Sequence, residues 1–286
     1  MKKGNFFGFS AIIIWSTLAL FTVLTKNIPP FLLLSISFTI ASFLGIVWMF
    51  LAKESIKILK QPWYVWVVGV GGLFGYHLFY FLALRNAPAV EANLINYLWP
   101  LLIVLFSAFL PNERLKWYHA VGAILGFSGA ILLVTRGGFL VQSEFILGYF
   151  YALLCALTWS TYSVISRLFG LVPTFAVTGF CVAVALLSFT VYLGFEPSYA
   201  LSPNEWLAAL ALGLGPVGGA FYLWDVGMKK GDIKLLGTLS YAIPLLSTLL
   251  LILFNLAQSS FIVWAAAALI IAGSIVSSLK YWKKSA

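Results

Sequence analysis

Charged residues are scarce in this chain of 286 residues. Asp, Glu, Lys and Arg together make up 9% of it, whereas soluble domains contain about 25%. Hydrophobic residues make up 62%, and the mean hydropathy is +1.03. A soluble globular domain cannot hide that much apolar surface from water. The composition therefore predicts an all-α integral membrane protein in a lipid bilayer.

Cysteine and histidine are nearly absent, with two of each. Cys155 and Cys181 show neither metal-ligand spacing nor a disulfide framework, so we expect both to be small buried residues. The chain also lacks a nucleotide-binding loop and a spaced cluster of His and acidic residues. These absences exclude ATP use and argue against an intramembrane enzyme. We predict that the protein is not an enzyme and uses no cofactor and no metal.

Long apolar runs, by contrast, recur from one end of the chain to the other. A membrane helix needs about 20 such residues, and the runs are separated by breakers such as KNIPP, PNERLK and KKGD. The connections are short, so sequential helices should be antiparallel neighbours. The runs predict ten spans, at residues 5–25, 30–52, 63–84, 89–110, 117–135, 145–166, 172–195, 206–226, 235–254 and 260–279.

The basic residues are distributed unevenly between the loops. If the N-terminus is cytoplasmic, 14 of the 17 Lys and Arg residues fall on the cytoplasmic side, and only Lys26, Arg85 and Arg136 fall on the other. This positive-inside pattern predicts that both termini are cytoplasmic. A nucleic-acid partner would need a folded basic face, which is missing. The apolar run after the first lysines is long and lacks a cleavage pattern, so we expect a retained first span rather than a signal peptide.

The sequence repeats itself at a shift of 144 residues. The triplet Trp15-Ser16-Thr17 falls on Trp159-Ser160-Thr161, and NYLWP at 96–100 falls on SYAIP at 240–244. Repetition predicts two five-helix domains, residues 1–141 and 142–286. Because five is odd, the second repeat enters the membrane upside down. Inverted repeats of this kind are typical of transporters, whose substrates bind near the midplane between the halves.

Each half has one span interrupted by proline, Pro100 in the fourth and Pro244 in the ninth. Proline removes a backbone hydrogen bond and crowds the preceding turn, so both spans should kink and free the carbonyls of Asn96 and Ser240. Asn93, Asn96, Tyr97 and Pro100 form one polar stripe on a helix face. We interpret spans four and nine as lining a substrate path; a bend that serves packing alone is the alternative.

Other polar and aromatic groups also lie inside the spans. Trp15 and Trp159 are far from the interfaces where tryptophan is usually found; they either pack in the core, with the neighbouring hydroxyls bonded to their own helices, or form a cavity wall. His77 is the histidine inside a span, either structural or titrating. Glu91 could be neutralised by Arg85 or meet a substrate amine, and Asp225 lies one turn from Lys229.

The segments EANLINYLWPLLIVLF at 91–106 and FYLWDVGMKKGDI at 221–233, the early Trp-Ser-Thr triplet and the duplication resemble the drug/metabolite transporter superfamily, in particular its EamA family. The resemblance implies a basket of helices around a central cavity, alternating access, and export of amino acids or related metabolites. The second half departs from the pattern, since Ile243 replaces Trp99 and Leu235 stands where Glu91 would recur. We therefore hypothesise that only the first half recognises the substrate.

We predict a secondary transporter that exports a small molecule, with aromatic and other neutral amino acids favoured, from the cytoplasm across the inner membrane of a bacterium. A multidrug or nucleoside exporter of the same superfamily is the alternative, and a monomer is the expected state. The candidate cavity residues are Trp15, Ser16, Tyr76, His77, Tyr80, Asn93, Asn96, Tyr97, Trp99, Pro100, Trp159, Ser160, Tyr222, Ser240, Tyr241 and Pro244.

Overall fold

The computed structural model describes residues 3–111, 113–135, 143–254 and 260–279, and the regular elements in these ranges are all helices. Spans two, three, five, six, seven and ten are single α-helices: α3 (Pro30–Leu51), α4 (Trp63–Asn86), α7 (Trp117–Thr135), α8 (Ile146–Leu168), α9 (Ala176–Phe195) and α14 (Phe261–Ser277). The predicted all-helical membrane fold is therefore confirmed, with most ends within two to four residues of the prediction.

The other four spans are each divided into two helices. Span one is α1 (Lys3–Ser16) and α2 (Leu18–Leu24), span four is α5 (Ala89–Asn96) and α6 (Leu98–Phe106), span eight is α10 (Pro203–Leu214) and α11 (Gly219–Lys230), and span nine is α12 (Ile233–Leu239) and α13 (Ala242–Leu253). Short 3-10 helices lie at Ile56–Leu59, Ser107–Phe109 and Ser143–Phe145. Eight spans in the described ranges are long and apolar enough to cross a membrane, and α14 is a shorter apolar helix.

The breaks in spans four and nine lie just before the two prolines. Tyr97 separates α5 from α6, and Ser240 and Tyr241 separate α12 from α13. Each proline is the third residue of the helix that follows. A proline ring crowds the carbonyl four residues earlier, which belongs to Asn96 or Ser240. The helix therefore yields before the proline, and the predicted interruption is found there.

We expected span eight to be continuous, and this was wrong. The chain leaves the helix at Gly215 and resumes at Gly219, so Pro216, which has no N–H, lies in the break. A Cβ at Gly218 would lie 1.8 Å from the carbonyl oxygen of Gly213, so only glycine fits there. Span one was also expected to be continuous, but it breaks at Thr17.

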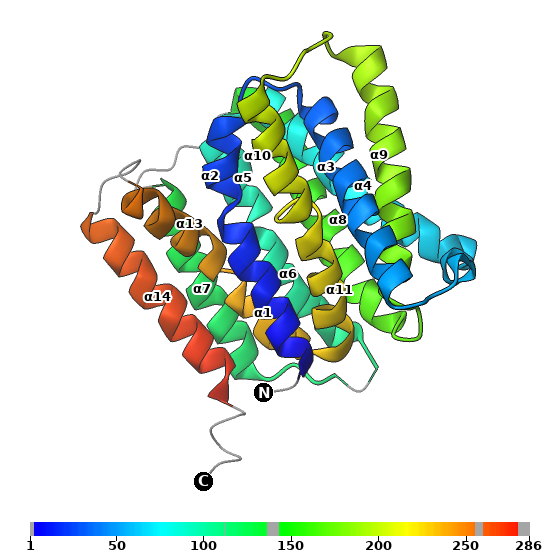
Figure 1. Ribbon diagram of the computed structural model, residues 1–286. Helices are drawn as coiled ribbons and strands as arrows, with labels where there is room; N and C mark the ends of the chain where they lie inside the picture. Colours follow the sequence, from blue (N-terminus) through cyan, green and yellow to red (C-terminus); the bar gives the residue numbers. More distant parts are fainter. Residues whose placement is uncertain (1–2, 112, 136–142, 255–259, 280–286) are drawn as a thin grey trace.

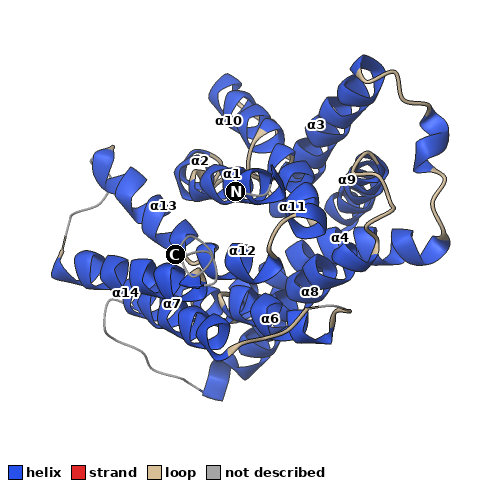
Figure 2. Ribbon diagram, turned by 90° about the horizontal axis from the view of Figure 1, so that it is seen from below, coloured by secondary structure: helices blue, strands red, loops and turns tan. Residues whose placement is uncertain are grey.

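The tightest helix pairs join the two halves of the chain. They are α3 with α9, α7 with α14, α4 with α8, and α1 with α11. In the first two pairs the partners are corresponding spans of the two halves. In the other two pairs, spans three and six of one pair correspond to spans eight and one of the other, as a pseudo-two-fold arrangement requires. Figures 1 and 2 show α14 beside α7 at one edge of the bundle and α3 beside α9 at the other. The predicted boundary at 141 and 142 lies outside the described residues.

Glycine allows close helix contact in span five, but the GxxxG pair Gly71 and Gly75 of span three does not. A Cβ at Gly122 would lie 2.6 Å from the carbonyl oxygen of Gly273, so α7 and α14 touch through their backbones. Gly71, in contrast, has no atom within 4 Å, and Gly75 has only ordinary contacts. The crowded glycines of α4 are Gly69, against the Phe180 ring, and Gly72, against the Tyr162 ring. The GxxxG spacing of Gly71 and Gly75 therefore does not mark the contact face of α4.

Candidate substrate cavity

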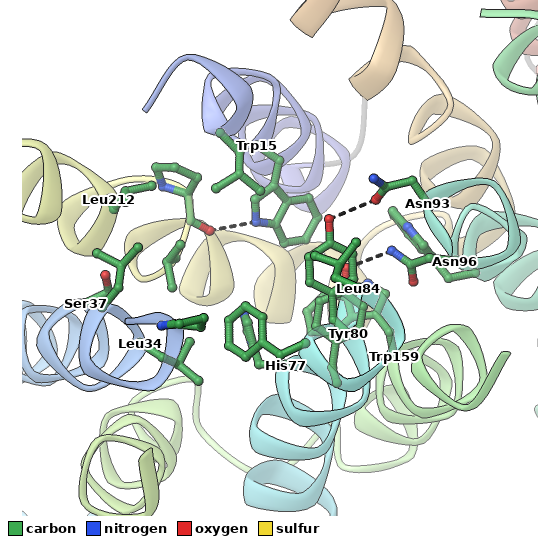
Figure 3. Close-up of a pocket in the computed structure, with 18 of the residues that line it drawn as sticks. Trp15, Leu34, Ser37, His77, Tyr80, Leu84, Asn93, Asn96, Trp159 and Leu212 are labelled. Atoms are coloured by element: carbon green, nitrogen blue, oxygen red, sulfur yellow. Dashed lines mark hydrogen bonds between the residues drawn. The ribbon is translucent and has the colours of Figure 1, made fainter. Parts of the chain in front are cut away.

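A cavity of about 310 Å³ lies in the middle of the bundle (Figure 3). It extends toward the end of the bundle where α3 begins with Pro30 and where Leu84 lies in the last turn of α4. Its size is at the lower end of the range for small-molecule sites. The lining residues are Trp15, Leu18, Pro30, Leu33, Leu34, Ser37, Tyr76, His77, Tyr80, Phe81, Leu84, Asn93, Asn96, Tyr97, Trp99, Trp159, Leu212, Pro216, Val217, Phe221 and Ile243.

Tryptophans form the floor of the cavity. The Trp15 ring lies 5.6 Å from that of Trp159 and 6.4 Å from that of Trp99, both nearly perpendicular to it. Below them, the buried Trp224 ring lies 5.0 Å from Trp15. Such edge-to-face contacts add about 0.5–1.5 kcal/mol per pair beyond the area that they bury. The floor is therefore a mutually packed cluster contributed by spans one, four, six and eight.

The indole N–H groups of this cluster differ in their partners. Trp15 donates to the carbonyl oxygen of Pro216, in the break of span eight, at 2.9 Å, and Trp224 donates to Ser163 Oγ at 3.0 Å. Within the described ranges, the structure shows no hydrogen-bond acceptor for the indole nitrogens of Trp99 and Trp159. The break in span eight thus supplies an acceptor for Trp15, while two indoles of the cavity wall keep a donor unused.

Two tyrosines and two asparagines connect α4 with α5. Tyr80 Oη donates to Asn93 Oδ1 at 2.8 Å, and Asn96 Nδ2 donates to Tyr76 Oη at 3.2 Å (Figure 3). The tyrosine rings are one turn apart and stacked, 6.2 Å between centroids and 5° from parallel. These bonds hold the polar stripe of α5 against one wall of the cavity.

His77 lines the cavity one residue beyond Tyr76. Its Nδ1 lies 2.7 Å from the carbonyl oxygen of Leu73. A carbonyl can only accept, so Nδ1 carries a proton, and Nε2 of a neutral ring is an acceptor. Phe38 and Phe221 pack edge-on to the imidazole, with centroids 5.6 Å and 6.1 Å away. This packing suits a structural histidine, and its titration stays a prediction.

Two polar atoms of the cavity wall have no protein partner. Four buried side-chain atoms in the described part of the chain make no hydrogen bond, and Ser37 Oγ and Asn96 Oδ1 are two of them. Several other helical serines bond back to a carbonyl of their own helix, as Ser42 does to Phe38 at 2.7 Å. Burying such an atom without a partner costs about 1–3 kcal/mol. Unpaired groups at a cavity are therefore candidates for a ligand contact.

The lining contains no Asp, Glu, Lys or Arg. One network of ion pairs lies at the end of the bundle where α1 begins and α14 ends, an end that can be located in Figure 1. There Glu113 accepts from Arg167 at 2.8 Å and from Lys234. Arg167 also donates to the carbonyl oxygens of Met228 and Gly231. This ion network joins spans six, eight and nine to the loop after span four, opposite the end that the cavity approaches.

Two further ion pairs in the described part of the chain lie outside the cavity lining. Asp225 bonds Lys229 at 2.8 Å, as its spacing predicts, and accepts from Thr174 at 2.7 Å. Arg85 lies 3.6 Å from Glu196 rather than beside Glu91. Glu196 also accepts from the backbone N–H groups at the start of α3, where a carboxylate stabilises the helix. Glu91 accepts from Tyr149, so of the two alternatives for Glu91, neutralisation by Arg85 is not found, and contact with a substrate amine stays a prediction.

Nine of the sixteen candidate residues line the cavity: Trp15, Tyr76, His77, Tyr80, Asn93, Asn96, Tyr97, Trp99 and Trp159. The other seven, Ser16, Pro100, Ser160, Tyr222, Ser240, Tyr241 and Pro244, are not among the lining residues. Ser16, Ser160 and Ser240 bond carbonyls of their own helices. Tyr222 donates to the carbonyl oxygen of Ala41, and Tyr241 accepts from the N–H of Leu101.

Sequence reasoning missed a set of mostly apolar lining residues: Leu18, Pro30, Leu33, Leu34, Ser37, Phe81, Leu84, Leu212, Pro216, Val217, Phe221 and Ile243. The Gly-Pro-Val-Gly stretch at 215–218 carried a usable signal, because proline and glycine together in a span indicate irregular backbone. In the sequence, by contrast, a leucine that faces a cavity cannot be distinguished from a leucine that faces lipid. Cys155 and Cys181 are buried free thiols, as expected.

Comparison with known proteins finds matches over nearly the whole length of the chain. A model of the EamA-like transporter family matches twice, at residues 2–135 and 146–279. The chain is 54% identical over 97% of its length, and 98% of the relative, to "Aromatic amino acid exporter YddG" of Ancylobacter novellus. It is 24% identical, over 96% of each chain, to the protein of the same name in Escherichia coli. A crystal structure superposes with a TM-score of 0.94 at 52% identity and covers 97% of this chain and 98% of that chain.

Proposed function

The chain belongs to the EamA-like transporter family, and from this premise we propose that it exports aromatic and other neutral amino acids. It does so as a monomer in the cytoplasmic membrane of a bacterium. The observation that carries this proposal is the aromatic cavity without charged side chains. Relatives matched over nearly their whole length bear the name of aromatic amino acid exporters, which supports the same cargo here.

The chemistry of the cavity favours a zwitterion with an aromatic ring. A ring gains apolar burial and edge contacts against Trp15, Trp99 and Trp159. A substrate with a net charge would lose hydration and find no opposite charge in the lining, which is costly in a region of low dielectric. A neutral zwitterion needs only dipoles and hydrogen bonds for its two charges. The cavity offers tyrosine, asparagine and histidine groups for that purpose.

Alternating access follows from the difference between the two ends of the bundle. The cavity extends toward one end, and the network of Glu113, Arg167 and Lys234 joins the helices at the other. The excess of basic residues supports a cytoplasmic position for the network and for both termini. The described conformation then faces outward. Loading from the cytoplasm requires the network to open, and the breaks in spans one, four, eight and nine provide hinges.

The test is uptake of radiolabelled tryptophan, phenylalanine, threonine and a nucleoside into proteoliposomes, with and without a pH gradient. We expect saturable uptake of tryptophan and phenylalanine that exceeds uptake by empty liposomes. Preference for the nucleoside would favour the alternative cargo class. Stimulation by the gradient would indicate proton coupling, and its loss in His77→Gln would assign that proton to His77.

A matched pair of variants connects transport to the cavity. Trp159→Leu should lower tryptophan uptake about tenfold, because it removes one aromatic wall. Trp206→Leu changes a tryptophan that is 52% exposed and outside the cavity, so uptake should stay the same. Equal loss in both variants would contradict the assignment of the cavity.

A further inference from the structure

Asn93 and Asn96 pair with their tyrosines in opposite senses. Asn93 uses its amide oxygen, which accepts from Tyr80, whereas Asn96 uses its amide nitrogen, which donates to Tyr76. A primary amide contains both a donor group and an acceptor. What each asparagine leaves unused is therefore different: a donor at Asn93 and an acceptor at Asn96.

Both unused groups belong to the cavity wall. Asn96 Oδ1 is a buried acceptor without a partner, and its side chain is fixed by the bond to Tyr76. Within the described ranges, no acceptor is found for Asn93 Nδ2. The two residues are three apart on one face of α5, where side chains lie about 5–6 Å apart between Cβ atoms. The cavity wall thus contains an unused donor on Asn93 and an unused, buried acceptor on Asn96. Figure 3 shows the other amide atom of each residue in its bond to a tyrosine.

The position of α5 reinforces this polarity. Asn96 is the last residue of α5, and Tyr97 breaks the span immediately after it. The C-terminal end of a helix carries partial negative charge, which favours a cation. The carbonyl of Asn96 also loses its usual intrahelical donor, because Pro100 has no N–H. An ammonium group beside Asn96 therefore meets a partial negative charge from both the side chain and the helix end.

We propose that this donor and acceptor bind the backbone of a zwitterionic amino acid. Asn93 Nδ2 donates to the substrate carboxylate, and Asn96 Oδ1 accepts from the substrate ammonium, while the substrate ring packs on the tryptophan floor. The inference rests on the proposed function and deepens it. It defines the substrate class as α-amino acids with both charges present, and it distinguishes them from aromatic amines.

The test replaces each amide by a carboxylate of the same shape. Asn93→Asp places negative charge at the carboxylate subsite, whereas Asn96→Asp places it at the ammonium subsite. In both variants the tyrosine hydroxyl can still donate to the new carboxylate. Transport of L-tryptophan and of tryptamine, which lacks the carboxylate, is measured in proteoliposomes. Asn86→Asp is the control, because Asn86 donates to its own helix at Leu82 and lies outside the cavity lining.

We expect Asn93→Asp to lower tryptophan transport about tenfold or more and to leave tryptamine transport unchanged or higher. Asn96→Asp should raise tryptamine transport relative to tryptophan transport, because the added negative charge favours the ammonium group that both substrates carry. Asn86→Asp should change neither. Equal loss of both substrates in the two cavity variants, or tryptophan loss confined to Asn96→Asp, would overturn the proposal.

Two further measurements separate this proposal from folding and from the proposed function. Tyr80→Phe keeps the ring but releases the Asn93 amide, so the preference for tryptophan over tryptamine should fall a few-fold. An unchanged preference in this well-folded variant would also count against the donor role of Asn93. A wild-type protein that carries no aromatic amino acid would overturn the proposed function itself, and the asparagine assignment with it.

Discussion

Tyr97 and Tyr241 occupy the same place in the two halves of the chain, each at the break of a span and three residues before a proline. Their side chains have different roles. Tyr241 is fully buried, and its hydroxyl accepts from the backbone N–H of Leu101, in the broken span of the other half, at 3.0 Å. Tyr97 is half-buried and lines the cavity. One tyrosine stabilises a break, and the other lines the cavity.

This difference extends to the residues around the two tyrosines. Asn96, Tyr97 and Trp99 all line the cavity, whereas Ile243 alone represents the corresponding stretch of the second half. In an ordinary helix the N–H of Leu101 would bond the carbonyl of Tyr97, and at the break Tyr241 replaces that partner. Duplication therefore accounts for the two broken helices, while divergence accounts for the different side chains at the two breaks. Second-half residues such as Trp159 also line the cavity, and the hypothesis drawn from Ile243 and Leu235 stays a prediction.

We expect the largest effect when Trp99 is replaced by isoleucine, the residue that the second half has at the corresponding position, Ile243. Trp99→Ile should lower tryptophan transport about tenfold, because the cavity loses an aromatic surface that the substrate ring would contact. Proteoliposome uptake measures this. Trp63→Ile, at a residue 76% exposed at the start of α4, should leave transport unchanged. If Trp99→Ile transports tryptophan at the wild-type rate, the floor does not bind the ring.

The next effect distinguishes the two tyrosines by stability. Tyr241→Phe leaves the N–H of Leu101 without its partner in the protein interior, which should cost about 1–3 kcal/mol of folding free energy. Tyr97→Phe removes a hydroxyl that has no partner among the described residues, so it should change stability by less than about 0.5 kcal/mol. Thermal melting in detergent compares the two variants. Equal melting temperatures would contradict the structural role of Tyr241.

The smallest effect concerns the unpaired hydroxyls. Ser37→Ala should weaken tryptophan binding about threefold, as expected for one neutral hydrogen bond to the substrate. Ser188 Oγ is also buried and unpaired but lies outside the cavity lining, so Ser188→Ala serves as the matched control and should leave binding unchanged. A Ser37→Ala protein that binds tryptophan as tightly as wild type would remove Ser37 from the site.

Much of the fold could be predicted because its causes are local or periodic. The apolar runs gave the spans, and proline beside polar residues indicated the breaks near Tyr97 and Tyr241. The break at Thr17 has no proline or glycine nearby; the freed carbonyl of Ser16 instead accepts from Ser247, 231 residues away, at 2.7 Å. A partner that distant in sequence leaves no local pattern. The break at Gly215 was missed because glycine spacing also fits close helix packing.

The candidate site was predictable where polar or aromatic residues stand out from an apolar helix. Asn93, Asn96 and Trp159 were identified in this way, and all three line the cavity. The same criterion selected Tyr222, whose hydroxyl instead donates to the carbonyl of Ala41. The direction in which a side chain points from its helix is set by the packing of that helix against its neighbours, which the sequence of a single span does not reveal. Ser37 was missed for the same reason, since an unpaired hydroxyl is visible only once its neighbours are placed.

The most direct test of unequal halves is the equilibrium Kd for tryptophan, measured for wild type, Trp99→Ile and Tyr241→Phe below the melting temperature of each protein. Our account predicts that Trp99→Ile binds about tenfold more weakly and that Tyr241→Phe stays within about twofold of wild type, because its loss is one of stability. Equal weakening in the two variants, or weaker binding only in Tyr241→Phe, would contradict unequal roles for the two broken helices in substrate binding.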